Sequence, residues 1–211
     1  GFAVLLLSEY KPTAWFGGAS RTGARVLDWA GEPTRDALPL RLMGGLHALV
    51  RAGADAELAE VFAGAVSAEA LNRILARNDD ALLPWLDGPP QTNEAGRSAS
   101  VMAALLWLSQ RLAPQGPARF ELIEIGASAG VNTMIERYRY DLGGVSVGPA
   151  DSPMRIAPEW RGPPPPADNI EIVAIHGSDI APVDLSDPAQ ALRIKAYVWP
   201  DATERLARID A

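Results

Sequence analysis

The chain has 211 residues, 48% of them hydrophobic, and this excludes a fibrous or wholly disordered protein because such a chain can bury a core. Lys and Arg number 19 against 26 Asp and Glu, a formal net charge of −7, so we expect no nucleic-acid partner. The chain has no cysteine and two histidines, which excludes disulfides and thiolate metal sites. We expect no metal ion.

No run of the sequence approaches the roughly 20 apolar residues that cross a bilayer. The apolar run of residues 2–7 is also too short for a secretory signal. We therefore expect a cytoplasmic protein with no membrane partner. The chain starts with Gly1, and a helical pattern over residues 204–211 still continues at the last residue, so we expect both ends to be fragment boundaries.

Between residues 38 and 110, apolar side chains recur at helical spacing, beginning with Leu42 and Leu46. This predicts about four short helices, a break at the Gly-Pro-Pro segment of residues 87–90, and then a longer helix. Short helices in a row are typical of a helical cap and not of a sheet. We predict that residues 1–113 form a helical amino-terminal cap region.

The pattern changes after the Pro- and Gly-containing connector. Residues 120–125 predict a strand, residues 126–130 a glycine turn, and the apolar residues from Val131 onward a helix. Residues 138–169 are rich in Gly and Pro, which predicts a hairpin or irregular excursion with a polyproline link. A second strand is predicted at residues 170–175.

Strand, glycine turn, helix and a second strand together indicate an α/β fold. We predict a Rossmann-like parallel sheet of methyltransferase type over residues 118–211, incomplete at its carboxyl end. Asp187-Pro188 favours a helix starting near Ala189, which Trp199-Pro200 would interrupt.

The glycine turn carries the clearest chemical signal. Its spacing is Glu124-x-Gly126-x-Ser128-x-Gly130. Glycine lets the backbone approach a ligand, and the following helix offers free N–H donors. The pattern lacks one glycine of the dinucleotide fingerprint and the Lys of a triphosphate loop. It matches the acidic-x-Gly-x-Gly/Ser-x-Gly turn of S-adenosylmethionine-binding folds.

The same residues also spell Gly-x-Ser-x-Gly, the nucleophile elbow of α/β-hydrolases. Ser128 would then be the nucleophile and His176 its base. That fold requires several strands before the elbow and a histidine far downstream. The residues before the turn are helical in pattern, and His176 ends the very next strand, so this is the weaker alternative.

Asp179 follows the second strand, where a doubly wound fold places a carboxylate that holds ribose hydroxyls. It lies 179 − 130 = 49 residues after Gly130 and not the usual distance of about 20, so residues 138–169 would be an insertion. Asp141 is nearer but does not end a convincing strand. The alternative role for Asp179 is that of a turn former.

Gln91, Asn93, Glu94 and Arg97 lie in a polar segment directly after the Pro-Pro break. A helix cap explains Asn93 and Glu94 but not the other two, so we also consider the four as residues lining the mouth of a pocket. His47 is a further pocket candidate. It lies on an apolar helix face, where a hydrogen-bonded core histidine is more common than a ligand.

Several blocks of the chain carry a family resemblance: Pro39-Leu40-Arg41-Leu42, Leu46-His47-Ala48-Leu49, Pro90-Gln91-Thr92-Asn93-Glu94, residues 124–132, Asp179-Ile180-Ala181-Pro182-Val183-Asp184 and Val198-Trp199-Pro200-Asp201. From about Trp29 onward they resemble, in order, an uncharacterised bacterial family, domain of unknown function 2332 (DUF2332). Its members are usually longer, which implies that later strands of the sheet lie beyond residue 211. The family has no established reaction.

The glycine turn is also similar to that of class I S-adenosylmethionine-dependent methyltransferases. This more distant resemblance implies a cofactor site made of Glu124, Gly126, Ala127, Ser128, Gly130 and Asn132, with Asp179 at the ribose. We therefore predict a small-molecule binder that resembles a methyltransferase, with S-adenosylmethionine as its cofactor. The alternatives are a non-catalytic binding or scaffold module with a degenerate pocket, and the Ser128 hydrolase. The sequence does not identify the methyl acceptor or the oligomeric state.

Overall fold

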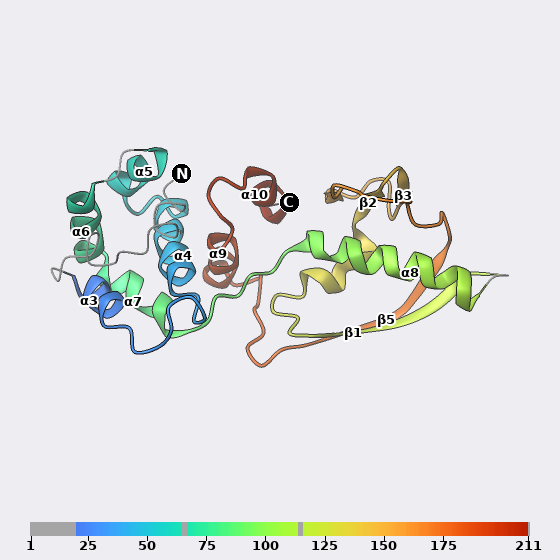
Figure 1. The fold of residues 1–211 in the computed structure, drawn as a ribbon, viewed down its shortest axis with the longest axis horizontal. Coiled ribbons are helices and arrows are strands. Elements are labelled where there is room, and N and C mark those ends of the chain that lie inside the picture. Colours follow the sequence, from blue (N-terminus) through green and yellow to red (C-terminus); the bar gives the residue numbers. More distant parts are fainter. Residues whose placement is uncertain (1–19, 65–66, 114–115, 211) are drawn as a thin grey trace. The chain divides into compact units, whose positions relative to one another are not determined.

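The computed structural model describes residues 20–64, 67–113 and 116–210. These residues form two compact units (Figure 1). The first, which we call the helical unit, contains the described residues up to Thr92 together with Pro188–Leu206. The second, the sheet unit, contains Asn93–Asp187 and the described residues from Ala207 onward. The predicted division into residues 1–113 and 118–211 stays a prediction about folding domains.

The helical unit is built from short helices, as the apolar spacing predicted. Their bounds are α3 Arg21–Leu27, α4 Leu38–Arg51, α5 Ala56–Ala63, α6 Ala68–Arg77, α7 Asp79–Asp87 and α9 Pro188–Ala196, followed by α10 Thr203–Asp210, which begins in this unit. Side-chain caps define several starts: Ser20, Asp55 and Ser67 each accept a backbone N–H three residues later.

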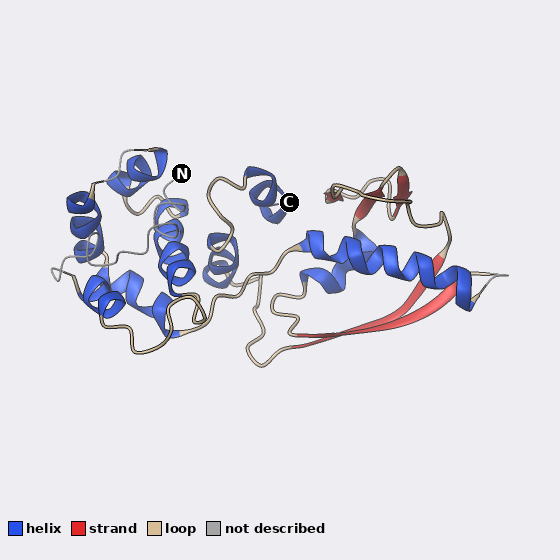
Figure 2. Cartoon of the chain, viewed as in Figure 1, coloured by secondary structure: helices blue, strands red, loops and turns tan. Residues whose placement is uncertain are grey.

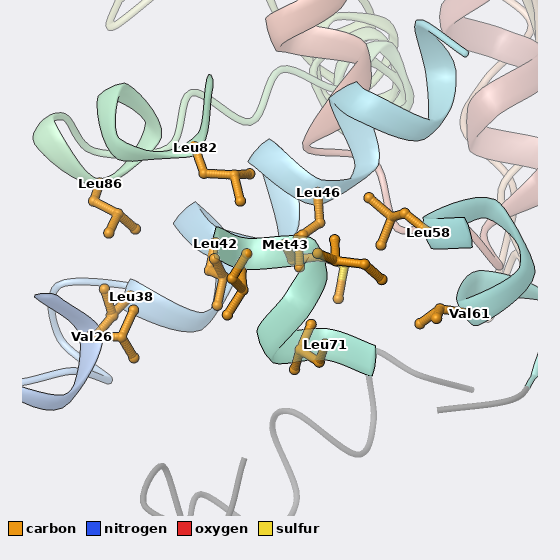
Figure 3. Close-up of a cluster of buried hydrophobic side chains, with 12 residues drawn as sticks. Val26, Leu38, Leu42, Met43, Leu46, Leu58, Val61, Leu71, Leu82 and Leu86 are labelled. Carbon is orange, nitrogen blue, oxygen red and sulfur yellow. The ribbon is translucent and has the colours of Figure 1, made fainter. Parts of the chain in front are cut away.

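The core of the helical unit is a single cluster of aliphatic side chains (Figure 3). Leu46, Leu58 and Leu71 are fully buried there and come from three different helices. Fully burying such a side chain contributes about 1.5–3 kcal/mol relative to leaving it exposed. Short helices are not stable alone in water, so this shared core stabilises them.

The sheet unit places one long helix against a small parallel sheet (Figure 2). Helix α8 spans Ser98–Leu112 and follows the 3-10 turn η1, Ala95–Arg97. Strand β1 is Ala118–Ile125, and β5 is Ile170–Ser178. The two strands are parallel, with a register irregularity after Phe120. Both predicted strands are therefore confirmed.

The connection from β1 to β5 contains a small sheet of its own. Its elements are the 3-10 helix η2 Val131–Arg137 and the strands β2 Arg139–Leu142, β3 Val145–Val147 and β4 Arg155–Ile156. Strands β2 and β3 form an antiparallel hairpin, and β4 lies parallel to β2. Of the hairpin or irregular excursion predicted for residues 138–169, the structure shows a hairpin at residues 139–147. Tyr140 is fully buried, and its hydroxyl lies 2.8 Å from Ser98 Oγ at the start of α8.

One local prediction is confirmed only in part. A helix was expected from Val131 onward, and the segment forms 3-10 turns with a non-helical residue, Met134, in the middle. Each turn is too short to build a substantial helix dipole, because the dipole grows with the number of aligned peptide units. The structure shows a mixed α/β chain with a small parallel sheet.

Candidate functional site

The glycine turn joins the end of β1 to η2 and has an unusual backbone. Gly126, Ser128 and Gly130 have φ values of 78°, 51° and 71°. This left-handed region suits glycine and costs a residue such as Ser128 of order 1–3 kcal/mol. Backbone strain in a non-glycine residue is a feature of functional sites, which makes Ser128 the notable member of the turn.

The turn packs closely on β5 because Gly177 has no side chain. A Cβ at Gly177 would lie 3.0 Å from the Cβ of Ala127 and 3.4 Å from Cγ2 of Thr133. Ala127 is itself only 5% exposed, and its N–H donates to the carbonyl oxygen of Ser178. The parallel strand therefore fixes the position of the turn.

The segment after β5 forms hydrogen bonds with the backbone of Ser128. Asp179 Oδ2 accepts the N–H of Ser128 at 2.8 Å, and its Oδ1 accepts the N–H of Ala181 at 2.8 Å. Val183 N–H in turn donates to the carbonyl oxygen of Ser128 at 3.1 Å. The N–H donors of Ala181 and Ser128 lower the pKa of Asp179 below its usual range. The structure thus brings Asp179 to the turn and gives it the bonds of a turn former.

Two side-chain amides also bind the turn. Asn132 Nδ2 donates to Glu124 Oε1 at 3.1 Å, which joins the first turn of η2 to the end of β1. Asn93 Nδ2 donates to the carbonyl oxygen of Ala127 at 2.8 Å. A carboxylate and a carbonyl can only accept, so these bonds fix the orientation of both amides. The amide oxygens, Asn93 Oδ1 and Asn132 Oδ1, take no part in these two bonds.

Four buried polar atoms in this part of the sheet unit have no hydrogen-bond partner. They are Asn93 Oδ1, Glu124 Oε2, Ser128 Oγ and Asn132 Oδ1. Each belongs to the turn or to a residue that bonds within it. Leaving a buried polar group unpaired costs about 1–3 kcal/mol, and such groups in native proteins normally bind a water, an ion or a ligand. This cluster defines the candidate site.

The other residues predicted to line a pocket mouth, Gln91, Glu94 and Arg97, are placed differently from Asn93. Glu94 Oε1 accepts the N–H of Gly96 at 3.1 Å and lies 3.4 Å from Nε of Arg208, which matches the cap role. Arg97 is exposed. Gln91 is half-buried in the helical unit. Within the polar segment after the Pro-Pro break, Asn93 is the residue whose bond to the glycine turn is described above.

His47 has the surroundings of a core histidine. It is 4% exposed in the helical unit, its Nδ1 lies 3.0 Å from the carbonyl oxygen of Ala196, and its ring stacks on Phe62. Burial lowers its pKa because the charged form loses water. These contacts join α4 to the end of α9 and provide no link to the glycine turn.

The geometry does not favour the hydrolase alternative. His176 Nε2 lies 3.1 Å from Glu121 Oε1, and Ser128 Oγ is buried without a partner that could activate it. The described residues before β1 are helical, whereas the nucleophile elbow follows several strands. We expect a fluorophosphonate probe to leave the native protein unlabelled, as measured by intact mass. A serine adduct mapped to Ser128 would contradict this.

A surface hollow lies at the opposite ends of the strands. It is lined by residues just before β1 and β5 and by the end of α8, including Gln110, Pro117, Asp168 and Asn169. Asp168 Oδ2 accepts the hydroxyl of Ser109 at 2.6 Å. Open α/β sheets bind ligands at the carboxyl ends of their strands, where the glycine turn lies. The hollow is therefore at the less favourable end.

Within residues 20–64, 67–113 and 116–210, no three His, Cys, Asp or Glu side chains are grouped so that they could hold a metal ion. In the same residues, no helix has both the length and the apolar character needed to cross a bilayer.

The fold and the turn thus define a mixed α/β protein with a polar cluster at the carboxyl end of a parallel strand. Residues 14–211 match the family described as "Uncharacterized protein conserved in bacteria (DUF2332)", and the chain belongs to this family. The family resemblance of the sequence blocks is therefore confirmed. Neither the curated proteins nor the solved structures contain a match.

Proposed function

We propose that the sheet unit binds a small molecule of the S-adenosylmethionine type at the glycine turn. The observation that carries this proposal is the cluster of four unpaired buried polar atoms on Asn93, Glu124, Ser128 and Asn132. A ligand that pairs with them would remove their desolvation cost on binding. The parallel β1–β5 pair supports a sheet of Rossmann-like, methyltransferase type, in which this turn is the ligand site.

The chemistry of the cluster selects among ligands. Three of its atoms are carboxylate or amide oxygens that can only accept, and the fourth is a hydroxyl. A phosphate would place its own oxygens against these acceptors and against the charge of Glu124. An ammonium group or ribose hydroxyls would donate to them instead. S-adenosylmethionine has both and no phosphate, so it fits the cluster better than a dinucleotide or a nucleoside triphosphate.

In this proposal, the residues of the turn hold and orient the ligand. Glu124, Asn132 and Asn93 accept hydrogen bonds from its ammonium or hydroxyl groups. When bound, S-adenosylmethionine supplies an electrophilic methyl group. The chain would contribute alignment of the acceptor and exclusion of water, because such a transfer requires little covalent help from the protein.

Calorimetric titration with S-adenosylmethionine tests the proposal. We expect saturation at one site per chain. Glu124→Gln keeps the size of the side chain and removes its charge, so the affinity should fall about tenfold to a hundredfold, as for a lost charged hydrogen bond. Glu121→Gln is the matched control, because Glu121 lies on the same strand with its side chain 60% exposed and bonded to His176. Its affinity should equal that of the wild type.

The same titration separates the alternatives. The absence of heat with the wild-type protein would overturn ligand binding and favour a non-catalytic scaffold with a degenerate pocket. Equal affinity for ATP would contradict the argument from the acceptor atoms, because the hydroxyl of Ser128 is the one donor that the cluster offers to its phosphates. An equal loss of affinity in both Glu variants would mean that the site is not at Glu124.

A further inference from the structure

Ser128 combines two unfavourable features. Its φ of 51° lies in the left-handed region, which favours glycine, and the other two positive-φ positions of the turn, Gly126 and Gly130, are glycines. Its hydroxyl oxygen is also buried without a hydrogen-bond partner. A glycine at residue 128 would remove both features. The stability of the turn therefore does not explain the serine.

Other buried serines of the sheet unit show what a structural hydroxyl does. Ser98 Oγ donates to the carbonyl oxygen of Ala95 at 2.5 Å, and Ser109 Oγ donates to Asp168 Oδ2 at 2.6 Å. The backbone N–H and carbonyl oxygen of Ser128 are both paired, but its hydroxyl has no such bond. This leaves the hydroxyl available to a bound molecule.

The chemistry of the cluster indicates which ligand group the hydroxyl meets. The other three unpaired atoms, on Asn93, Glu124 and Asn132, are oxygens that only accept, so Ser128 is the one donor of the cluster. An α-amino acid carries a carboxylate on the same carbon as its ammonium group, and a carboxylate is a strong acceptor for a hydroxyl. Unlike a phosphate, this end of a ligand is neutral overall and presents its own cation to Glu124.

We infer, on the basis of the proposed function, that Ser128 is a specificity-determining residue whose hydroxyl donates to the carboxylate of the ligand's amino-acid end. The strained backbone at residue 128 then accompanies the placement of a donor among acceptors, because glycine has no hydroxyl to offer. The site selects ligands that carry an ammonium group and a carboxylate on one carbon. A ligand with the amine alone binds more weakly.

Calorimetric titration of the full chain with two ligands tests this inference. S-adenosylmethionine has the carboxylate, and decarboxylated S-adenosylmethionine keeps the amine without it. We expect the wild type to bind the first about tenfold to a hundredfold more tightly, as for one charged hydrogen bond. Ser128→Ala removes the hydroxyl and keeps the Cβ, so this variant should bind the two ligands with nearly equal affinity.

Thr133→Val is the matched control for the titration. Thr133 Oγ1 donates to the carbonyl oxygen of Gly130 at 2.7 Å, so this variant removes a nearby hydroxyl that already has a partner within the chain. The ratio of its affinities for the two ligands should equal the ratio in the wild type.

The stability of the ligand-free protein provides a second readout. Ser128→Gly removes the strained serine backbone and the unpaired hydroxyl, so its Tm by circular dichroism should rise by about 2–4 °C. Its affinity for S-adenosylmethionine should fall as in Ser128→Ala. A serine with a purely structural role would not combine a higher Tm with weaker binding.

The outcomes separate this inference from the proposed function. If Ser128→Ala keeps the preference of the wild type for the ligand with the carboxylate, the inference is overturned and the proposed function stands. Equal affinity of the wild type for the two ligands, or a Tm of Ser128→Gly below that of the wild type, would also overturn the inference alone. The absence of heat with S-adenosylmethionine in the wild type would overturn both.

Discussion

Replacing Asp55 by alanine is expected to lower the free energy of unfolding by about 2–4 kcal/mol, the sum of a lost helix cap and lost charged hydrogen bonds. Asp55 is 7% exposed and accepts the N–H of Leu58 at 2.9 Å at the start of α5. Its carboxylate also accepts from Arg77, at 2.5 and 2.8 Å, and from Asn78 at 2.7 Å. Urea unfolding followed by tryptophan fluorescence measures the loss.

Glu57→Ala is the control for this variant. Glu57 also bonds to Arg77, but its side chain is 35% exposed, so water replaces much of what is lost and we expect a change below about 1 kcal/mol. Equal losses of unfolding free energy in the two variants would show that the helix cap and the burial of Asp55 contribute nothing to stability.

The same interaction predicts a dependence on pH. Hydrogen bonds from Arg77 lower the pKa of Asp55 from 3.8 to about 2 in the folded protein. Because the folded pKa lies below the unfolded one, this stabilisation is complete above about pH 4 and is lost as the pH falls towards 2, an effect of about 2 kcal/mol. The difference between wild type and Asp55→Ala should therefore shrink between pH 5 and pH 2.5. A constant difference would contradict the sign of the shift.

Gly148→Ala is expected to destabilise the sheet unit by roughly 3–5 kcal/mol, since it combines a strained backbone with a steric clash. Gly148 follows β3 with a φ of 85°, and an added Cβ would lie 2.0 Å from the carbonyl oxygen of Tyr138. A backbone atom cannot rotate away as a side chain does. Thermal unfolding by circular dichroism should show a lower Tm in this variant.

Gly144→Ala separates the two contributions. Gly144 lies in the same hairpin with a φ of 95°, but an added Cβ there would meet no atom within 4 Å. The expected cost is only that of the left-handed backbone, about 1–2 kcal/mol. If the two alanine variants unfold at the same temperature, the clash with Tyr138 is absent in solution.

The elements of this fold follow closely from local sequence signals. Apolar spacing predicted the helices around Leu42 and Leu46, because the 3.6-residue period places such side chains on one face. The runs at residues 120–125 and 170–175 predicted strands for a different reason: they are short, rich in isoleucine and other apolar residues, and partly alternate apolar with polar side chains, as the two-residue period of a strand requires. At residues 131–137 the expected helix is limited to 3-10 turns: Gly130 adopts the left-handed region directly before the segment, and Met134 departs from helical angles within it.

The sequence predicted only some of the residues of the candidate site. The spacing of Glu124, Ser128 and Asn132 around the glycines indicated a ligand turn. In the polar segment that contains Asn93 and Arg97, no pattern indicated that Asn93 would bond to Ala127. Asp179 was predicted for a ribose, and that role stays a prediction, since its observed bonds are to backbone N–H groups of the loop and the turn.

The features that could be predicted and those that could not differ in how far apart along the chain the interacting residues lie. Helical spacing, turn glycines and strand composition act between residues a few positions apart, so the order of amino acids alone established the helical region, the two strands and the turn between them. Other features depend on atoms from segments 34 to 149 residues apart along the chain. These features are the buried oxygens that remain unpaired and the contacts of His47. Only packing in three dimensions brings those atoms together.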